Sequence, residues 1–237
     1  MADSSYVALA TNIFTAPREA FAALKERPRV LLPVVVLMIG FSVVSFYFLS
    51  HVDMGFFLDN QMRAGNASIT DAQREQAVAA ATKIPPLVYG AIGAVSSIFF
   101  VFLIILLVAS YYTVVSFVTN DGVKLKQWFA LLCWCTLPQV LGIIAQLVNM
   151  IVNDPRFMLQ DQINPLAFGN LLSIDRTGVS LVQRILLGID VTAIWSLVLQ
   201  VLGYQYFTKK SYATSAAIVL GPIAMIVLVG TLIALRR

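Results

Sequence analysis

The sequence predicts an all-α membrane protein, a polytopic helix bundle with five transmembrane helices and a short N-terminal interfacial amphipathic helix. Of its 237 residues, 59% are hydrophobic, and many of these gather in five long apolar runs. Each run is long enough to cross a hydrocarbon core of about 30 Å, which takes roughly 20 helical residues. The runs lack the alternating polarity of a membrane barrel, and a helix satisfies its own backbone in lipid. The five predicted spans are residues 30–50, 87–118, 129–152, 181–204 and 212–235.

The polar segments between the runs are too short to form a second domain. The longest are residues 1–29, 51–84 and 153–180, and none of them would bury a core of its own. The sequence therefore predicts one membrane domain over residues 1–237.

The N-terminal segment predicts a short helix over residues 15–27. Phe14, Phe21 and Leu24 fall near one helical face, Pro17 suits an early helical position, and Pro28 ends the segment. We expect this helix to lie on the membrane surface, and the alternative is that it packs on the bundle.

The second predicted span carries a face of small residues near its start. Gly90, Gly93 and Ser97 follow one another there at intervals of three and four residues. Small residues at this spacing allow close helix contact. Together with the N-terminal apolar face, they are the candidate interface for a membrane protein partner or for self-association.

The loops predict the orientation. Arg27 and Arg29 precede the first span, and the two short loops carry two lysines each, whereas the long loops carry scattered acidic residues. Basic short loops face the cytoplasm. The N-terminus is therefore expected to be cytoplasmic, and with five spans the C-terminus is expected to be external.

Both long loops carry local structure in this prediction. Ser68 or Thr70 would cap a short helix that runs through Ala81. The second long loop contains several large apolar side chains, so we expect it to re-enter the membrane or to lie along its surface.

Polar residues within the spans are costly and therefore informative. Asp190 falls near the middle of the fourth span, where it would serve as a proton or cation site or as an anchor for a basic partner. The favoured alternative is a hydrogen-bonded carboxyl that fixes helix packing. Gln183 lies seven residues earlier on the same helical face.

The third span carries a narrow polar stripe. Gln139, Gln146, Asn149 and Asn153 fall within about 80° of arc on a helix. The stripe would either line a hydrated path for a solute or form hydrogen bonds to the fourth span, and we favour the second interpretation. Pro138 within this span predicts a kink, as do the prolines of the first and fifth spans.

The sequence lacks the residues that most catalytic sites need. Its only histidine is His51, and Asp190 is the only carboxylate within a predicted span. Its two cysteines, Cys133 and Cys135, are read as small buried side chains. No Gly-rich phosphate loop ends in lysine, and no basic cluster contains interleaved aromatics. We therefore expect no enzyme, no metal or cofactor, and no nucleic-acid partner.

The N-terminal pattern resembles bacterial proteins of the Yip family, named for Ypt/Rab-interacting proteins. The resemblance rests on the stretch from Ile13 to Phe21, on Pro28, on Leu31-Leu32-Pro33, and on residues 125–140 with Gln127, Ala130 and Leu137-Pro138. It implies five spans, a cytoplasmic N-terminus, an external C-terminus and a bacterial inner (cytoplasmic) membrane. The Asp-Leu-Tyr-Gly-Pro element of eukaryotic members is absent, so a Rab-type GTPase is not an expected partner.

The resemblance favours a non-enzymatic scaffold or accessory subunit of a membrane complex. The alternative hypothesis is a transporter or channel for a small polar solute, lined by the polar faces of the third and fourth spans.

Overall fold

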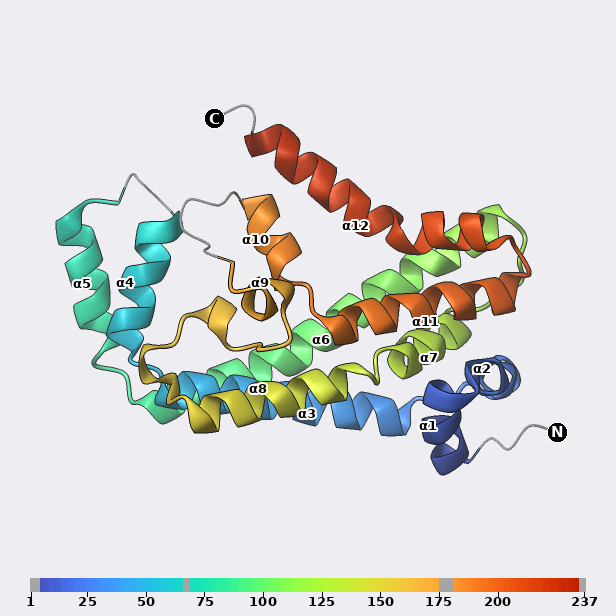
Figure 1. The fold of residues 1–237 in the computed structure, drawn as a ribbon, viewed down its shortest axis with the longest axis horizontal. Helices are drawn as coiled ribbons and strands as arrows, with labels where there is room; N and C mark the ends of the chain where they lie inside the picture. The colour runs from blue at the N-terminus through green and yellow to red at the C-terminus, as the bar shows by residue number, and fades with distance from the viewer. Residues whose placement is uncertain (1–4, 66–68, 175–180, 235–237) are drawn as a thin grey trace.

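The computed structural model describes residues 5–65, 69–174 and 181–234, and its regular elements in these ranges are helices. Most of the long helices run roughly along one axis, whereas α12 diverges from them in its second half, and the connection from α9 through α10 to α11 lies near the middle of the bundle (Figure 1). In chain order the elements are α1 (Tyr6–Thr15), α2 (Pro17–Glu26), α3 (Leu31–His51), α4 (Met54–Gly65), α5 (Asp71–Ala81), α6 (Pro86–Val118), α7 (Leu125–Cys135), α8 (Gln139–Val152), the 3-10 turns η1 (Pro155–Phe157) and η2 (Gln160–Gln162), α9 (Phe168–Leu171), α10 (Leu181–Gly188), α11 (Val191–Thr208) and α12 (Tyr212–Ala234).

The all-α prediction is confirmed, but the number of spans is not. Among the described residues, α3, α6 and α12 are each long and apolar enough to cross a membrane. A fourth span is obtained if the bent pair α7 and α8 counts as one. The two predicted spans in the middle of the chain are therefore the ones that differ from straight helices.

The predicted third span is bent by 43° between α7 and α8. Pro138 lies at this break and donates no backbone hydrogen bond, so the helix cannot continue straight through it. The kink predicted at this proline is confirmed. The α7 side of the bend is deeply packed, because every residue from Leu131 to Cys135 is buried.

The predicted fourth span is not one helix. It is divided into α10 and α11, and Asp190 is the N-cap of α11 in an extended conformation. The prediction that Asp190 lies within a continuous helix is therefore wrong. Aspartate is a strong N-cap because its carboxylate accepts the free backbone N–H groups of the first turn. Here Asp190 accepts a hydrogen bond from the backbone N–H of Ala193.

The closest helix pair is α3 with α6, and glycines make its contact possible. A Cβ atom on Gly90 would lie 3.0 Å from the Phe46 carbonyl oxygen, and one on Gly93 would lie 2.4 Å from Leu49 Cδ1. Ser97 continues this face, and its hydroxyl donates to the hydroxyl of Ser42 on α3 at 3.4 Å. The small-residue face of α6 thus contacts a neighbouring helix of the same chain.

The N-terminus forms two helices rather than the single predicted one. The break is at Ala16, immediately before Pro17 at the first position of α2. Phe21 and Leu24 are completely buried in a core that also contains Trp128 and Phe207. The alternative prediction, a helix packed on the bundle, describes this segment better than a helix lying freely on the membrane.

The loop between α3 and α6 forms a pair of helices, α4 and α5. The predicted cap of α5 is confirmed, because Thr70 and Gln73 exchange the two hydrogen bonds of a capping box. Asp59 of α4 pairs with Arg74 of α5 at 2.8 Å and with Arg63 at 2.7 Å. Helix α4 was not predicted.

The tight α3–α6 contact generates a prediction for Gly90→Ala. The added methyl group would meet the backbone of α3 rather than a flexible side chain, so the two helices must separate slightly. Overpacking of this kind costs about 1–3 kcal/mol. We expect the variant to unfold in detergent at a lower temperature or denaturant concentration than the native protein, as measured by far-ultraviolet circular dichroism.

Gly188→Ala is the matched control, because the same methyl group at the end of α10 would meet nothing within 4 Å. An equal loss of stability in both variants would contradict the packing argument.

Candidate functional site

The two interrupted helices approach each other where their polar residues lie. Gly142 of α8 faces the start of α11, and a Cβ atom on it would lie 3.1 Å from Thr192 Oγ1 and 3.7 Å from Asp190 Oδ2. A side chain at this position would press first on the Thr192 hydroxyl, which is hydrogen-bonded to Asp190. The absence of a side chain at Gly142 therefore allows the third predicted span to contact the break in the fourth.

The Asp190 carboxylate accepts three hydrogen bonds. Oδ1 accepts from the Thr192 hydroxyl at 2.6 Å and from the Ala193 backbone N–H at 2.7 Å. Oδ2 accepts from Asn164 Nδ2 at 2.5 Å. The Thr192 hydroxyl, the Ala193 N–H and the Asn164 amide are all donors, so both carboxyl oxygens of Asp190 act as acceptors here.

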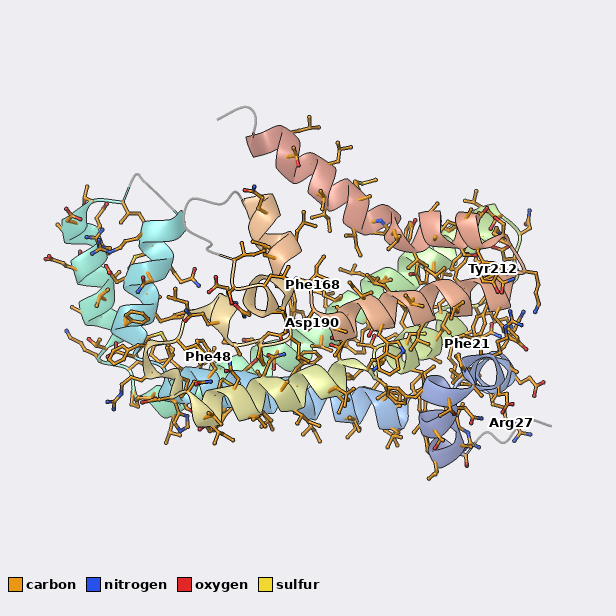
Figure 2. The ribbon with its side chains drawn as sticks, viewed as in Figure 1. Phe21, Arg27, Phe48, Phe168, Asp190 and Tyr212 are labelled. Atoms are coloured by element: carbon orange, nitrogen blue, oxygen red, sulfur yellow. The ribbon has the colours of Figure 1, made fainter. Side chains whose placement is uncertain are left out.

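The segment around α9 folds back onto the α10–α11 break. The backbone N–H of Phe168 donates to the Ile189 carbonyl at 3.0 Å, and Ala167 pairs with Asp190 in an isolated antiparallel bridge. Phe168 and Asp190 accordingly lie together near the middle of the bundle's length (Figure 2). Non-helical backbone at membrane depth has to be buried in protein or lie beside water, and here protein contacts satisfy part of it.

Asn170 fixes the same segment from within. Its side-chain amide donates to the backbone carbonyls of Asp161 and Asn164. Asn164 therefore uses its side chain for Asp190 and its carbonyl for Asn170. We call Asp190, Thr192, Asn164 and the Gly142 contact the Asp190 node.

Asn149 binds the same loop at a different place. Its amide donates to the carbonyls of Gln162 and Ile163, both at 2.9 Å, and its carbonyl oxygen accepts from Asn153 at 2.7 Å. Asn149, Asn153 and Gln162 also line an open pocket of about 500 Å³. This pocket lies at the end of α8, and its lining residues do not include Asp190.

The remaining candidate polar residues do not join either group. Gln139 and Gln146 are half-buried on α8, whereas Gln183 is exposed on α10, beyond the break. The helical face that Gln183 was predicted to share with Asp190 does not exist, because the two residues lie on different helices. Among the described residues, no pocket is therefore lined by all five of the predicted polar site residues, which are Gln139, Gln146, Asn149, Gln183 and Asp190.

A hydrogen-bond seam does link other spans. Tyr112 of α6 donates to Gln200 of α11 at 3.2 Å, and Tyr111 donates to the carbonyl of Ile218 on α12 at 3.2 Å. Sequence reasoning predicted a seam between the third and fourth spans. The third span instead contributes Gly142 and binds the loop that follows it.

Two residues of the Asp190 node, Asn164 and Thr192, were not among the predicted site residues. Asn164 precedes a proline in the second long loop, for which the sequence predicted only re-entry into the membrane or a position along its surface. Thr192 follows Asp190 by two residues, a position from which a hydroxyl reaches an N-cap carboxylate. That pattern is visible in the sequence once a helix start at Asp190 is considered.

The predicted interface residues lie at three different sites. Phe21 and Leu24 are in the core, and the face of Gly90, Gly93 and Ser97 contacts α3. Phe14 is 40% exposed and packs its ring edge against Trp195, with the ring centroids 5.3 Å apart.

Basic side chains concentrate at the end of the bundle that holds α1 and α2. Lys210 forms an ion pair with Asp121, and Lys25 donates to the Phe207 carbonyl at 2.7 Å. Gln127 in turn donates to the Lys25 carbonyl, and the Trp134 indole donates to the Arg29 carbonyl. These contacts bind the N-terminal helices to α7 and α11.

The geometry offers no recognisable metal centre within the part of the chain that the structure describes. No three histidine, cysteine or acidic side chains there are grouped so as to hold an ion. Cys133 and Cys135 are both buried and unbonded. The groups at the Asp190 node can hold backbone and side chains in register.

The fold and the node together define an integral membrane protein of the multi-pass helical class. The Yip1 domain family matches residues 11–234, nearly the whole chain, so the protein belongs to the Yip1 domain family. No curated protein matches the chain at a significant level. No solved structure does either.

Proposed function

We propose that this Yip1 domain protein is a non-enzymatic scaffold or accessory subunit of a membrane complex in a bacterial inner membrane. The observation that carries the proposal is the loose attachment of α12. Its second half leaves the bundle in Figure 1. Met225, Ile226 and Leu228 are between 60% and 66% exposed although they point in different directions around the helix.

Helix α12 also presents small residues to its surroundings. Ala213, Ala217 and Ala224 are exposed and fall within about 40° of arc on one face. Small residues in this arrangement let a partner helix approach closely in lipid, where van der Waals contact drives association. This face is the proposed contact with a partner subunit or a second copy.

The proposal predicts a contact that is specific to this face. A photoreactive maleimide on Ala224→Cys should give a covalent adduct with a partner or a second copy in native membranes. The matched control is Leu107→Cys, which is also an exposed position, 56% for the native side chain, but lies on α6. Both native cysteines are fully buried and should stay unlabelled in the folded protein.

Adduct formation should then be lost when Ala217→Leu is added, because the larger side chain blocks close approach. Either the absence of any protein adduct at Ala224→Cys or an identical set of adducts at both positions would overturn the scaffold proposal.

We further propose five membrane crossings, with the N-terminus cytoplasmic and the C-terminus external. The basic residues of the end that holds α1 and α2 support this orientation. Lys25, Lys124 and Lys210 lie at that end, whereas Arg63 and Arg74 of α4 and α5, at the other end, are paired with Asp59 (Figure 1).

The orientation predicts opposite accessibility for two cysteines. Gln76→Cys on α5 should react with a membrane-impermeant maleimide in intact cells, whereas Ser211→Cys should react only after lysis. The reversed pattern would contradict the proposed orientation, and labelling of both in intact cells would contradict the odd number of crossings between them.

A transporter for a small polar solute is the second candidate. One observation favours it, namely that two interrupted helices meet at Gly142 and Asp190, since broken helices often form substrate sites at the bilayer midplane. The test expresses Asp190→Asn in cells that lack the native protein, and it measures the abundance of the variant and its rescue of the deletion phenotype. The transport hypothesis predicts that rescue is lost although the variant is present at normal abundance.

Asn164→Ala is the matched control, because it breaks the same node and keeps the carboxylate. Equal loss in both variants would mean that Asp190 acts through packing, and full rescue by Asp190→Asn would remove the transport hypothesis.

A further inference from the structure

A second pocket lies where the start of α2 meets α11 and α12. It has a volume of about 310 Å³. Its polar lining comes from Arg18, Gln205 and Tyr212, and Pro17 and Leu202 contribute apolar surface. Tyr212 and the neighbouring Phe21 lie at the end of the bundle where the N-terminal helices dock (Figure 2).

Arg18 enters this pocket with its charge unpaired. Its guanidinium donates to the neutral Tyr212 hydroxyl at 2.9 Å. The adjacent Glu19 also lines the pocket, and its carboxylate accepts from Asn12 at 3.3 Å. None of the ion pairs among residues 5–65, 69–174 and 181–234 involves Arg18.

Other positive charges lie close by. Lys25 is two helical turns beyond Arg18 on the same face of α2, and it reaches the carbonyl of Phe207. Partial burial, and then the charge of Lys209, lower the pKa of Lys25. The N-terminal end of α2, which Ala16 caps without a side-chain hydrogen bond, adds a partial positive charge at Pro17.

An apolar stripe on α11 leads directly to this pocket. Ile194, Trp195 and Val198 are 42%, 37% and 51% exposed, with the Phe14 ring against one side of Trp195, and Leu202 of the pocket follows at the same helical spacing. Residues three and four apart form one continuous face. The site is therefore apolar along the helix, and at its end Arg18, Lys25 and the N-terminus of α2 outweigh the one lining carboxylate, that of Glu19, which complements an anionic lipid.

We propose that this pocket binds the phosphate headgroup of an anionic phospholipid, with an acyl chain along the exposed stripe of α11. Arginine binds phosphate oxygens with two parallel, charge-assisted hydrogen bonds, and Tyr212 and Gln205 add further polar groups. The apolar stripe favours a lipid over a free phosphate ion, which would gain nothing from it. This inference does not depend on the scaffold role.

The test measures lipid retention by the full-length protein in detergent, using native mass spectrometry. The probes are phosphatidylglycerol, zwitterionic phosphatidylcholine and inorganic phosphate. We expect phosphatidylglycerol to bind the native chain preferentially and to bind Arg18→Gln about tenfold more weakly, the effect of losing one charge-assisted contact. Arg27→Gln, an equal charge change at the exposed end of α2, should bind like the native chain.

A second variant tests the apolar part without changing charge. Leu202→Trp should fill the pocket beside Arg18 and reduce phosphatidylglycerol retention, while circular dichroism verifies that both variants keep their helical content. Equal weakening by Arg18→Gln and Arg27→Gln would show general charge attraction and overturn the site. Binding of phosphatidylcholine as tight as phosphatidylglycerol, or inorganic phosphate binding that Arg18→Gln abolishes without affecting lipid, would also overturn it.

Discussion

The requirement that backbone N–H and C=O groups find partners in lipid shapes this protein wherever a helix is interrupted. Helices α3 and α6 meet the requirement by themselves, over 21 and 33 residues, whereas Pro222 in α12 cannot donate to the Ile218 carbonyl, which accepts from Tyr111 instead. The break before α11 meets it with side chains instead. Asp190 accepts from the first turn of α11, and the chain around α9 bonds to the backbone on the other side of the break.

The helices differ in how closely they pack within the chain. Helices α3, α6, α7 and α11 pack closely, because glycines allow close helix contact and Trp128 stacks on Tyr204 with ring centroids 4.9 Å apart. The second half of α12 is more exposed. Membrane helices associate through packing and hydrogen bonds rather than through a hydrophobic effect, so the side chains of α12 that stay exposed beside its contacts with α10 and α11 can pack on another helix.

Apolar run length and the positions of proline were enough to predict the helical class and the bend at Pro138. They were not enough at Asp190, because hydropathy counts an aspartate in an apolar run as a cost and does not register that it is also a strong N-cap. The Asp190 node depends on Asn164, which is 26 residues away along the chain. Single-sequence periodicity carries no information on such contacts. The N-terminal helices illustrate the same limit, since their buried face could have been covered by lipid or by protein with an identical pattern.

The docking of α1 and α2 also sets an order of assembly. These helices leave the ribosome before the rest of the bundle, yet Arg18 and Lys25 find their partners at Tyr212 and Phe207, 194 and 182 residues later. The face of Phe21 and Leu24 can therefore be covered only in part by α7, through Trp128, until α11 has been synthesised. During that interval the rest of this apolar face is accessible to chaperones, to the insertion machinery and to the membrane surface, and α11 completes its cover.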